Sequence, residues 1–140
     1  MQKLSDIQHP AGIRHSAGKR LKFTGKEYEH LTADQTAHEI MSILEDKKAM
    51  NIEIVDLEGK TILADRFVIA TGTSVTHIRA LSGEVEQIMK EKHQIVPGHI
   101  EGYNTGRWIL MDYADVVVHI FNAEDRDFYS LEKLWRTARI

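Results

Sequence analysis

The first strong pattern along the chain is a helical spacing of apolar residues that begins near residue 33. Thr32 and Gln35 stand three positions apart, as in a capping box, in which each side chain binds the other residue's backbone N–H. The apolar positions that follow recur at helical spacing: Ala37, Ile40, Met41 and Leu44. Lys47 and Lys48 favour the C-terminal end through the helix dipole. The pattern predicts a helix over residues 33–49.

Two short apolar runs come next, and both have the length of a strand. Residues 51–57 contain spaced apolar positions, and residues 66–71 are almost continuously apolar, with a turn at Gly59 between the two runs. A run of this second kind is typical of a strand that is buried on both faces. We therefore expect residues 66–71 at the centre of a sheet, with Gly72 ending the strand.

A second amphipathic helix and a hairpin are predicted further along the chain. Ser74 is suited to cap this helix, since its hydroxyl can accept a backbone hydrogen bond. The apolar stripe of the helix comprises Ile78, Leu81, Val85, Ile88 and Met89. Residues 108–112 and 115–121 are rich in strand-forming types and flank Tyr113 and Ala114. A tight hairpin is expected there, although Tyr-Ala is not a favoured turn pair.

The last amphipathic segment is expected to pack back on the sheet. Its apolar positions are Phe128, Leu131, Leu134 and Trp135. The order helix, strand, strand, helix, hairpin, helix predicts an α/β fold, in which helices flank a mixed β-sheet. A chain of 140 residues fits one domain, which we place at residues 32–140. Residues 1–31 have no apolar period and contain scattered glycines and basic side chains, so we expect a flexible basic extension.

Composition excludes several classes of site. The chain has no cysteine, which rules out disulfides and thiolate metal sites. Its eight histidines form no H-x-H or H-E-x-x-H pair, so no metal site is expected from local spacing. No stretch approaches the roughly 20 apolar residues that a membrane-spanning helix needs.

Charge is unevenly distributed between the extension and the domain. Residues 1–31 hold six basic and three acidic side chains, whereas the rest of the chain holds 12 basic and 18 acidic ones. An acidic domain is a poor match for nucleic acid, because neutralising phosphates dominates that affinity. It suits a basic protein partner better. The excess of acidic side chains in the domain is explained equally well as ordinary surface charge that keeps the protein in solution.

Three groups of residues have types that can take part in catalysis, and each has a simpler structural explanation. The turn of residues 71–74 could present backbone N–H groups to a phosphate, but without a following lysine we interpret it as a helix cap. The acidic pairs are Asp56 with Glu58 and Asp125 with Asp127, and their spacing favours solvated or turn-capping acids over a two-metal site. Ser74 and His77 lack the surrounding G-x-S-x-G of a nucleophile elbow.

His119 is interpreted as a hydrogen-bonded histidine in the core or on the sheet surface, and not as a base. Tyr103, Arg107, Trp108 and Tyr113 lie close together in sequence and are of the types enriched at interface hot spots. Composition alone leaves Trp108 open as either a partner anchor or a core residue.

Several ordered motifs resemble one known family. They are residues 64–74 (ADRFVIATGTS) with His77 and Arg79, Glu101-Gly102 with residues 106–113 (GRWILMDY), residues 115–121 (DVVVHIF), and Tyr129-x-Leu131-Glu132-x-Leu134-Trp135. Together they resemble the ribosomal silencing factors (the RsfS or Iojap family) over about residues 33–137. The resemblance implies a nucleotidyltransferase-like fold that lacks the catalytic acids, with no enzyme activity and no cofactor.

The resemblance also implies a partner. A family member binds the ribosomal protein uL-fourteen on the intersubunit face of the large subunit, blocks joining of the small subunit, and represses translation when nutrients are short. This implies the bacterial cytoplasm, no membrane and little or no direct nucleic-acid contact. A factor for large-subunit assembly and a nucleotidyltransferase-like enzyme are kept as alternatives, and a homodimer off the ribosome is left open.

The resemblance implies that the hairpin is the contact surface. The partner-binding residues carried over are Trp108, Tyr113, Leu110 and Asp112, with Arg107 and Glu101 beside them. One departure concerns the turn, where Ala114 stands in place of the glycine usual in the family. This replacement is expected to alter the geometry of the hairpin.

Overall fold

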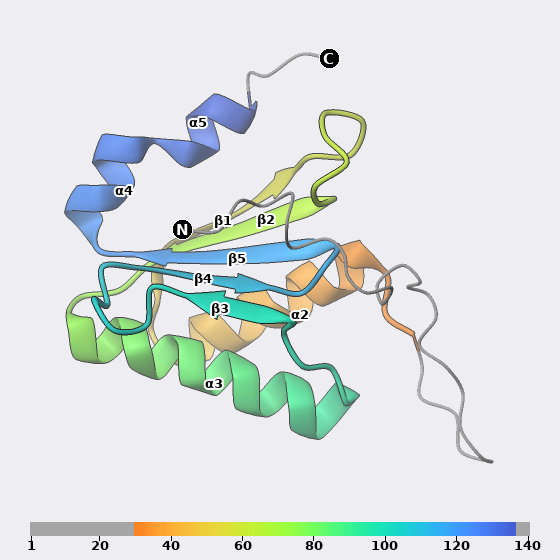
Figure 1. The fold of residues 1–140 in the computed structure, drawn as a ribbon. Coiled ribbons are helices and arrows are strands. Elements are labelled where there is room, and N and C mark those ends of the chain that lie inside the picture. The colour runs from red at the N-terminus through yellow and green to blue at the C-terminus, as the bar shows by residue number, and fades with distance from the viewer. Residues whose placement is uncertain (1–29, 137–140) are drawn as a thin grey trace.

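A five-stranded mixed sheet with helices on both faces forms the structure, a computed structural model that describes residues 30–136 (Figure 1). The elements are α2 (Ala33–Asp46), β1 (Met50–Asp56), β2 (Arg66–Thr71), α3 (Val75–His93), β3 (His99–Glu101), β4 (Trp108–Asp112), β5 (Val116–Phe121), α4 (Ala123–Tyr129) and α5 (Leu131–Arg136). The strand order is β1-β2-β5-β4-β3. Only β2 and β5 are parallel, and the other neighbours are antiparallel. The predicted α/β class is confirmed, while all but the last two residues of the extension at residues 1–31 lie outside the described range.

The first helix starts as its sequence predicts and ends sooner. The backbone N–H of Gln35 donates to Thr32 Oγ1 at 3.0 Å, and that of Thr32 donates to Gln35 Oε1 at 2.9 Å, so the capping box is formed. The helix ends at Asp46 because Lys48 has a left-handed backbone (φ 68°). The Leu44 carbonyl then accepts the N–H of Ala49 at 3.0 Å, which turns the chain into β1.

The predicted central strand has the expected boundaries and burial. All of β2 after Arg66 is buried, and the strand pairs with β1 on one side and β5 on the other. Gly72 follows at a close approach, since a Cβ there would lie 2.6 Å from Ile78 Cγ1. Ser74 Oγ then accepts the backbone N–H of His77 at 3.0 Å and caps α3. The turn is thus the helix cap that the sequence predicts.

Two features differ from the sequence-based prediction. The short strand β3 was not predicted. The C-terminal segment forms two helices, not one, because Ser130 takes a left-handed backbone (φ 46°) between α4 and α5. Leu131 and Trp135 pack against the sheet as predicted. The prediction is wrong for Phe128 and Leu134, which are 79% and 61% exposed, because a single helical period does not continue through the break.

The helices divide the sheet into two unlike faces. Helices α2 and α3 lie on one face, and α4 and α5 lie on the other (Figure 1). The first face carries the larger apolar cluster, to which the predicted residues Ala37, Ile40, Leu44, Ile78, Leu81, Val85 and Met89 belong. The second cluster is smaller and includes Phe67, Leu110, Val117 and Phe121. Within residues 30–136, no helix combines the length and apolarity that crossing a membrane requires.

Candidate partner-binding site

Antiparallel pairing of β3 with β4 gathers most of the predicted partner-binding residues on one face of the sheet. Glu101 lies opposite Leu110, and His99 lies opposite Asp112. Partners that are directly opposite share a face, as do residues two apart on one strand. Since Leu110 belongs to the smaller apolar cluster, all of these side chains lie on the side of α4 and α5. The resulting β3–β4 face consists of Trp108, Leu110, Asp112, His99 and Glu101.

Trp108 forms one end of the β3–β4 face and is only half-buried. Its ring centroid lies 4.6 Å from that of Phe121 and 4.9 Å from that of Tyr129. Its indole N–H donates to Nδ1 of His119 at 3.0 Å. The indole is therefore held rigidly while part of its surface stays accessible, which suits an aromatic anchor.

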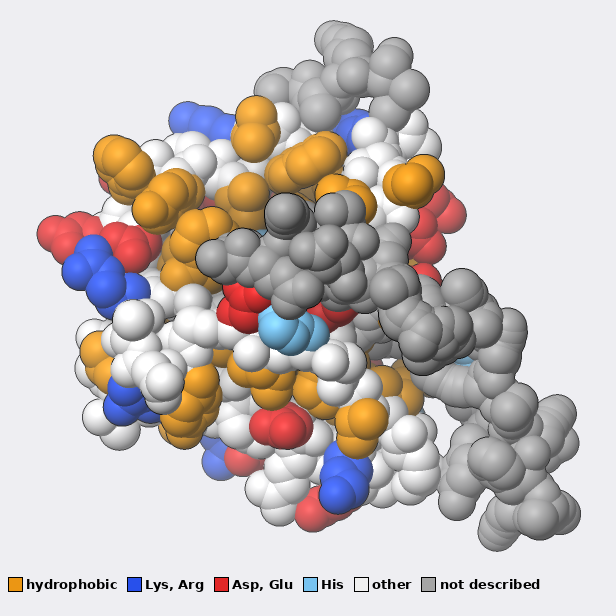
Figure 2. All heavy atoms as spheres, in the orientation of Figure 1, with side chains coloured by type: hydrophobic (Ala, Val, Ile, Leu, Met, Phe, Trp, Pro, Cys, Tyr) orange, Lys and Arg blue, Asp and Glu red, His pale blue; other side chains and the backbone are white. Residues whose placement is uncertain are grey.

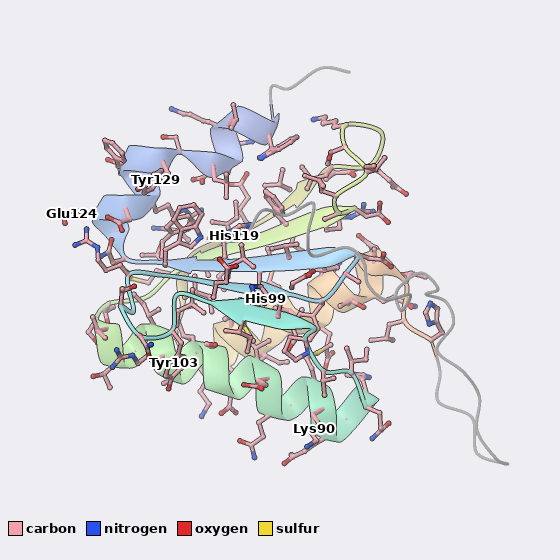
Figure 3. The ribbon with its side chains drawn as sticks, viewed as in Figure 1. Lys90, His99, Tyr103, His119, Glu124 and Tyr129 are labelled. Carbon is pink, nitrogen blue, oxygen red and sulfur yellow. The ribbon has the colours of Figure 1, made fainter. Side chains whose placement is uncertain are left out.

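His119, which is labelled in Figure 3, is the buried acceptor of the Trp108 hydrogen bond. It is 1% exposed, and its ring lies edge-on to Phe67 with centroids 4.5 Å apart. Burial lowers the pKa of His119 to about 3, so the ring is neutral at physiological pH. Because Nδ1 accepts the hydrogen bond, the proton of the neutral ring belongs on Nε2. The interpretation of His119 as a hydrogen-bonded core residue is confirmed.

The other end of the β3–β4 face carries carboxylates around an apolar centre. Glu101 Oε2 lies 2.6 Å from His99 Nε2, and the two side chains are 16% and 32% exposed. Leu110 and Asp112 are buried more deeply, at 1% and 3%. Figure 2 shows acidic side chains beside a histidine near the centre of the view. A basic group of a partner would meet negative charge here, next to apolar area.

The hairpin turn forms with Ala114 at the position where the resemblance leads one to expect glycine. Ala114 has a left-handed backbone (φ 73°), which is unfavourable for a residue with a Cβ. The carboxylate of Asp112 accepts the Ala114 N–H at 2.8 Å and supports this conformation. The Tyr113 N–H donates to the Val116 carbonyl at 2.8 Å, and Asp112 stays in register with Val117.

Two of the six predicted residues lie away from the β3–β4 face. Tyr113 belongs to the apolar cluster under α2 and α3 and is 8% exposed. Burial raises the pKa of its phenol, and nearby Glu86 adds to the effect. Arg107 lies at the rim beyond Trp108, where it pairs with Asp125 through contacts of 2.6 and 3.1 Å. The hydrogen bond from Arg107 lowers the pKa of the Asp125 carboxyl.

The loop between β3 and β4 is held in a fixed shape beside the backbone of Trp108. Gly102 has a φ of 86°, and a Cβ there would lie 2.1 Å from the Trp108 carbonyl oxygen, so the close approach requires glycine. Arg79 donates to the Tyr103 carbonyl at 2.9 Å and also to that of Asn104. Its guanidinium carbon lies 5.4 Å from the centroid of the Tyr103 ring (Figure 3).

Sequence reasoning missed His99 as a member of the β3–β4 face. The signal that was available is the alternation His99-Ile100-Glu101 between two glycines, which is typical of a short strand. Ile100 lies opposite Met111 on the other face of the sheet, as such alternation requires.

The acidic pair Asp56 and Glu58 and the residue His77, which were candidates for catalysis, make contacts that stabilise the fold. Arg66 Nη1 lies 3.1 Å from Asp56 Oδ1 and 3.4 Å from Glu58 Oε1. Asp56 also accepts the Glu58 N–H at 3.0 Å, so the prediction of a turn-capping acid is confirmed. His77 ties the Thr73 N–H, at 2.9 Å, to the Lys47 carbonyl, also at 2.9 Å. In the part of the chain that the structure describes, no group of acidic or histidine side chains could hold a metal ion.

Comparison with known proteins finds one consistent family. Residues 30–140 match the family model described as "Ribosomal silencing factor during starvation". The chain is 37% identical to the ribosomal silencing factor RsfS of Halalkalibacterium halodurans over 98 residues, which are 70% of this chain and 83% of that protein.

Two further relatives extend the comparison to a solved structure and to an organelle protein. A crystal structure of a Chromobacterium violaceum protein has a TM-score of 0.73 and 32% identity, and the match covers 79% of this chain and 91% of the other. The "mitochondrial assembly of ribosomal large subunit protein 1" of Mus musculus is 30% identical over 109 residues, which are 76% of this chain and 48% of that protein.

Proposed function

The chain belongs to the ribosomal silencing factor family, whose members are not enzymes, and we propose that it acts by binding the large-subunit protein uL-fourteen through the β3–β4 face. Membership makes the protein a ribosome-binding regulator of translation. The proposal adds the identity of the partner, the contacting residues and the mechanism.

One observation carries this choice of surface. Trp108, Leu110, Asp112 and Glu101 were selected by resemblance from two separate motifs, and β3–β4 pairing brings all four to one side of the sheet. The combination of a fixed aromatic ring, an apolar centre and flanking carboxylates suits a basic protein surface. Arg107 extends the surface at its rim. Tyr113 acts from the opposite side of the sheet by holding the hairpin in place.

The mechanism that we propose is steric. A domain of this size bound to the intersubunit face of the large subunit occupies space that the small subunit needs. Neither a cofactor nor a chemical step is required, and repression under nutrient limitation follows from occupancy alone. We expect the protein to act in the cytoplasm of a bacterium.

Co-sedimentation tests this mechanism directly. The full chain is mixed with purified large subunits and centrifuged, and small subunits are then added. We expect stoichiometric pelleting with large subunits and loss of joined ribosomes. If the protein fails to pellet at micromolar concentration, the proposed contact is wrong. If it pellets and joining continues, steric block is wrong while binding stands.

A charge-neutralising variant tests the surface. Asp112→Asn keeps the oxygen that accepts the Ala114 N–H, so the turn is retained while the charge is lost. We expect affinity for large subunits to fall roughly tenfold and to depend less on salt. The control is Glu86→Gln, which removes one charge from exposed α3 on the other side of the sheet. Equal effects of the two variants would mean that overall charge, and not the β3–β4 face, sets the affinity.

Assembly of the large subunit is the second candidate function. It is favoured by the similarity to the Mus musculus protein, whose name describes such a role in mitochondria. The contact would be the same, and the timing would differ. Depletion of the protein in growing cells separates the two, because an assembly factor leaves incomplete large subunits whereas a silencing factor leaves complete ones.

We also propose that the sheet is a nucleotidyltransferase-like scaffold that has lost its chemistry. In support, Asp56 and Glu58 are engaged by Arg66, and Asp125 is engaged by Arg107. Tight magnesium-nucleotide binding in a calorimetric titration would contradict this proposal.

A further inference from the structure

The described helices cover the α4–α5 side of the sheet unevenly. Leu131 and Trp135 pack on the smaller apolar cluster, which comes mainly from β1, β2 and β5 and includes Leu110 of β4. Tyr129 reaches the Trp108 end of β4. In Figure 1, α4 and α5 rise above β5, β2 and β1, while β3 is the opposite edge strand of the sheet. Within residues 30–136, therefore, no helix lies over the Asp112 end of the β3–β4 face.

The N-terminal end of the described chain lies near this same end of the sheet. Asp34, in the first turn of α2, places Oδ1 3.5 Å from Arg66 Nε. Arg66 begins β2 and is in register with Val116, which follows the hairpin turn directly. Asp112 precedes that turn. Residues 1–29 thus connect to the domain beside the end of the sheet where Asp112 lies.

Charge and length suit residues 1–29 to this surface. They hold six basic and three acidic side chains, and the basic ones include Lys19, Arg20, Lys22 and Lys26. At about 3.3 Å per residue, 29 residues can span roughly 95 Å, several times the ~17 Å length of a five-residue strand. Because the segment is tethered, its effective concentration at the face is on the order of millimolar, so weak contacts are enough.

We propose that residues 1–29 dock on the β3–β4 face of their own domain, with basic side chains beside Glu101 and Asp112. Since this is the surface assigned to the ribosomal partner, the segment competes with that partner, and this consequence rests on the proposed function. The apparent affinity for the ribosome then falls in proportion to the fraction of molecules whose face is open. A higher concentration of the ribosomal partner is then needed to displace the segment and bind.

Cross-linking in the isolated protein tests the docking without a ribosome. A zero-length carbodiimide joins lysines to carboxylates in contact, and the full chain is used at low concentration. We expect Lys19, Lys22 or Lys26 to couple to Glu101, and the product to disappear at high salt. The exposed carboxylates Glu86 and Glu91 on α3 are internal controls.

Two results of this experiment would overturn the docking. Equal coupling to the α3 carboxylates, or no coupling to Glu101, would show that the segment has no preference for the β3–β4 face. Mixing protein grown in ¹⁴N with protein grown in ¹⁵N distinguishes links within one chain from links between chains. Links found only between chains would assign the face to a second copy.

Charge reversal in the segment tests the competition. The full chain carrying Lys19→Glu, Arg20→Glu and Lys22→Glu is compared with a control carrying Lys48→Glu and Lys90→Glu at exposed positions of the domain. We expect the first variant to bind large subunits roughly three- to tenfold more tightly than wild type, and the control to show no gain.

The remaining outcomes are distinguishable. Weaker binding by the segment variant would mean that these basic residues contact the ribosome, for example its RNA, and the competition would be wrong. Unchanged affinity would also overturn it. If neither protein binds large subunits, the proposed function fails, while the cross-linking result still decides whether the segment docks.

Discussion

The two faces of the sheet differ in what covers them. The face under α2 and α3 is packed with aliphatic side chains from both helices and all five strands, and Ile40, Ile78 and Leu81 have no exposed surface. The face under α4 and α5 mixes aromatic rings with His119 and ends in the carboxylates of the β3–β4 face. The first face provides most of the stability of the domain. The second has a polar outer part that lies beyond the helices, which is why we propose that residues 1–29 and the ribosomal partner compete for it.

The largest expected effect is on the stability of the first face. Leu81→Ala should lower the free energy of unfolding by about 3 kcal/mol, since it leaves a cavity beneath α3. Chemical denaturation measures this loss, with exposed Gln87→Ala on the same helix as the control, expected within about 0.5 kcal/mol of wild type. Affinity per folded molecule for large subunits should not change. A loss of affinity in the folded variant would mean that the two faces do not have separate roles in stability and binding.

The next largest effect is on binding through the second face. Trp108→Ala should weaken binding to large subunits by about 2 kcal/mol or more, because it removes the proposed aromatic anchor. Trp135→Ala is the matched control, since this residue packs on the same cluster from α5. Both variants should lose stability, and only the first should lose affinity in a sedimentation titration. Full affinity in folded Trp108→Ala would remove this residue from the interface.

A pH effect of similar size should arise from His119. Its pKa is about 3 in the folded protein, well below the ordinary value near 6.5. Between these two pH values the imidazole is protonated in the unfolded chain and neutral in the native state. Stability should therefore fall as the pH drops below about 6.5, by roughly 2 kcal/mol at pH 5. His119→Gln keeps an acceptor for the Trp108 indole and has no such titration. Denaturation at pH 7 and pH 5 should show a smaller loss for the variant, and equal losses would contradict the assignment.

The smallest expected effect concerns the turn between the two faces. Ala114→Gly relieves an unfavourable left-handed backbone but increases the freedom of the unfolded chain, so stability should rise by roughly 0.5 to 1 kcal/mol. Thermal unfolding would detect this gain as a higher Tm. Affinity for large subunits should stay within twofold of wild type. A loss of stability would mean that the alanine methyl makes a favourable contact.

Features encoded within a few residues could be predicted from the sequence. The capping box of Thr32 and Gln35, the limits of β2 and the cap at Ser74 each depend on neighbours in the chain. The position of Tyr113 could also have been foreseen. It lies five residues after Trp108, and an odd separation in a strand puts two side chains on opposite faces.

Other features depend on contacts between distant segments and left little local signal. β3 has only three residues, too few for a clear strand pattern, and it is stabilised by its pairing with β4. The break at Ser130 follows from the packing of Leu131 and Trp135 against the sheet, which no helical period indicates. The hydrogen bond between Trp108 and His119 joins residues on adjacent strands and requires the β4–β5 register to be known.

Asp112 serves the proposed contact surface and the turn at the same time. Its carboxylate lies on the β3–β4 face, and the same carboxylate holds the left-handed Ala114 in the turn. A substitution that alters recognition at this position therefore also weakens the hairpin, unless the new side chain keeps the acceptor oxygen. Asparagine at position 112 keeps an oxygen that can accept the Ala114 N–H, so this substitution removes the charge and retains the turn. A lineage that first acquired glycine at position 114 would be free to change the charge afterwards, so the order in which substitutions arise should matter at this hairpin.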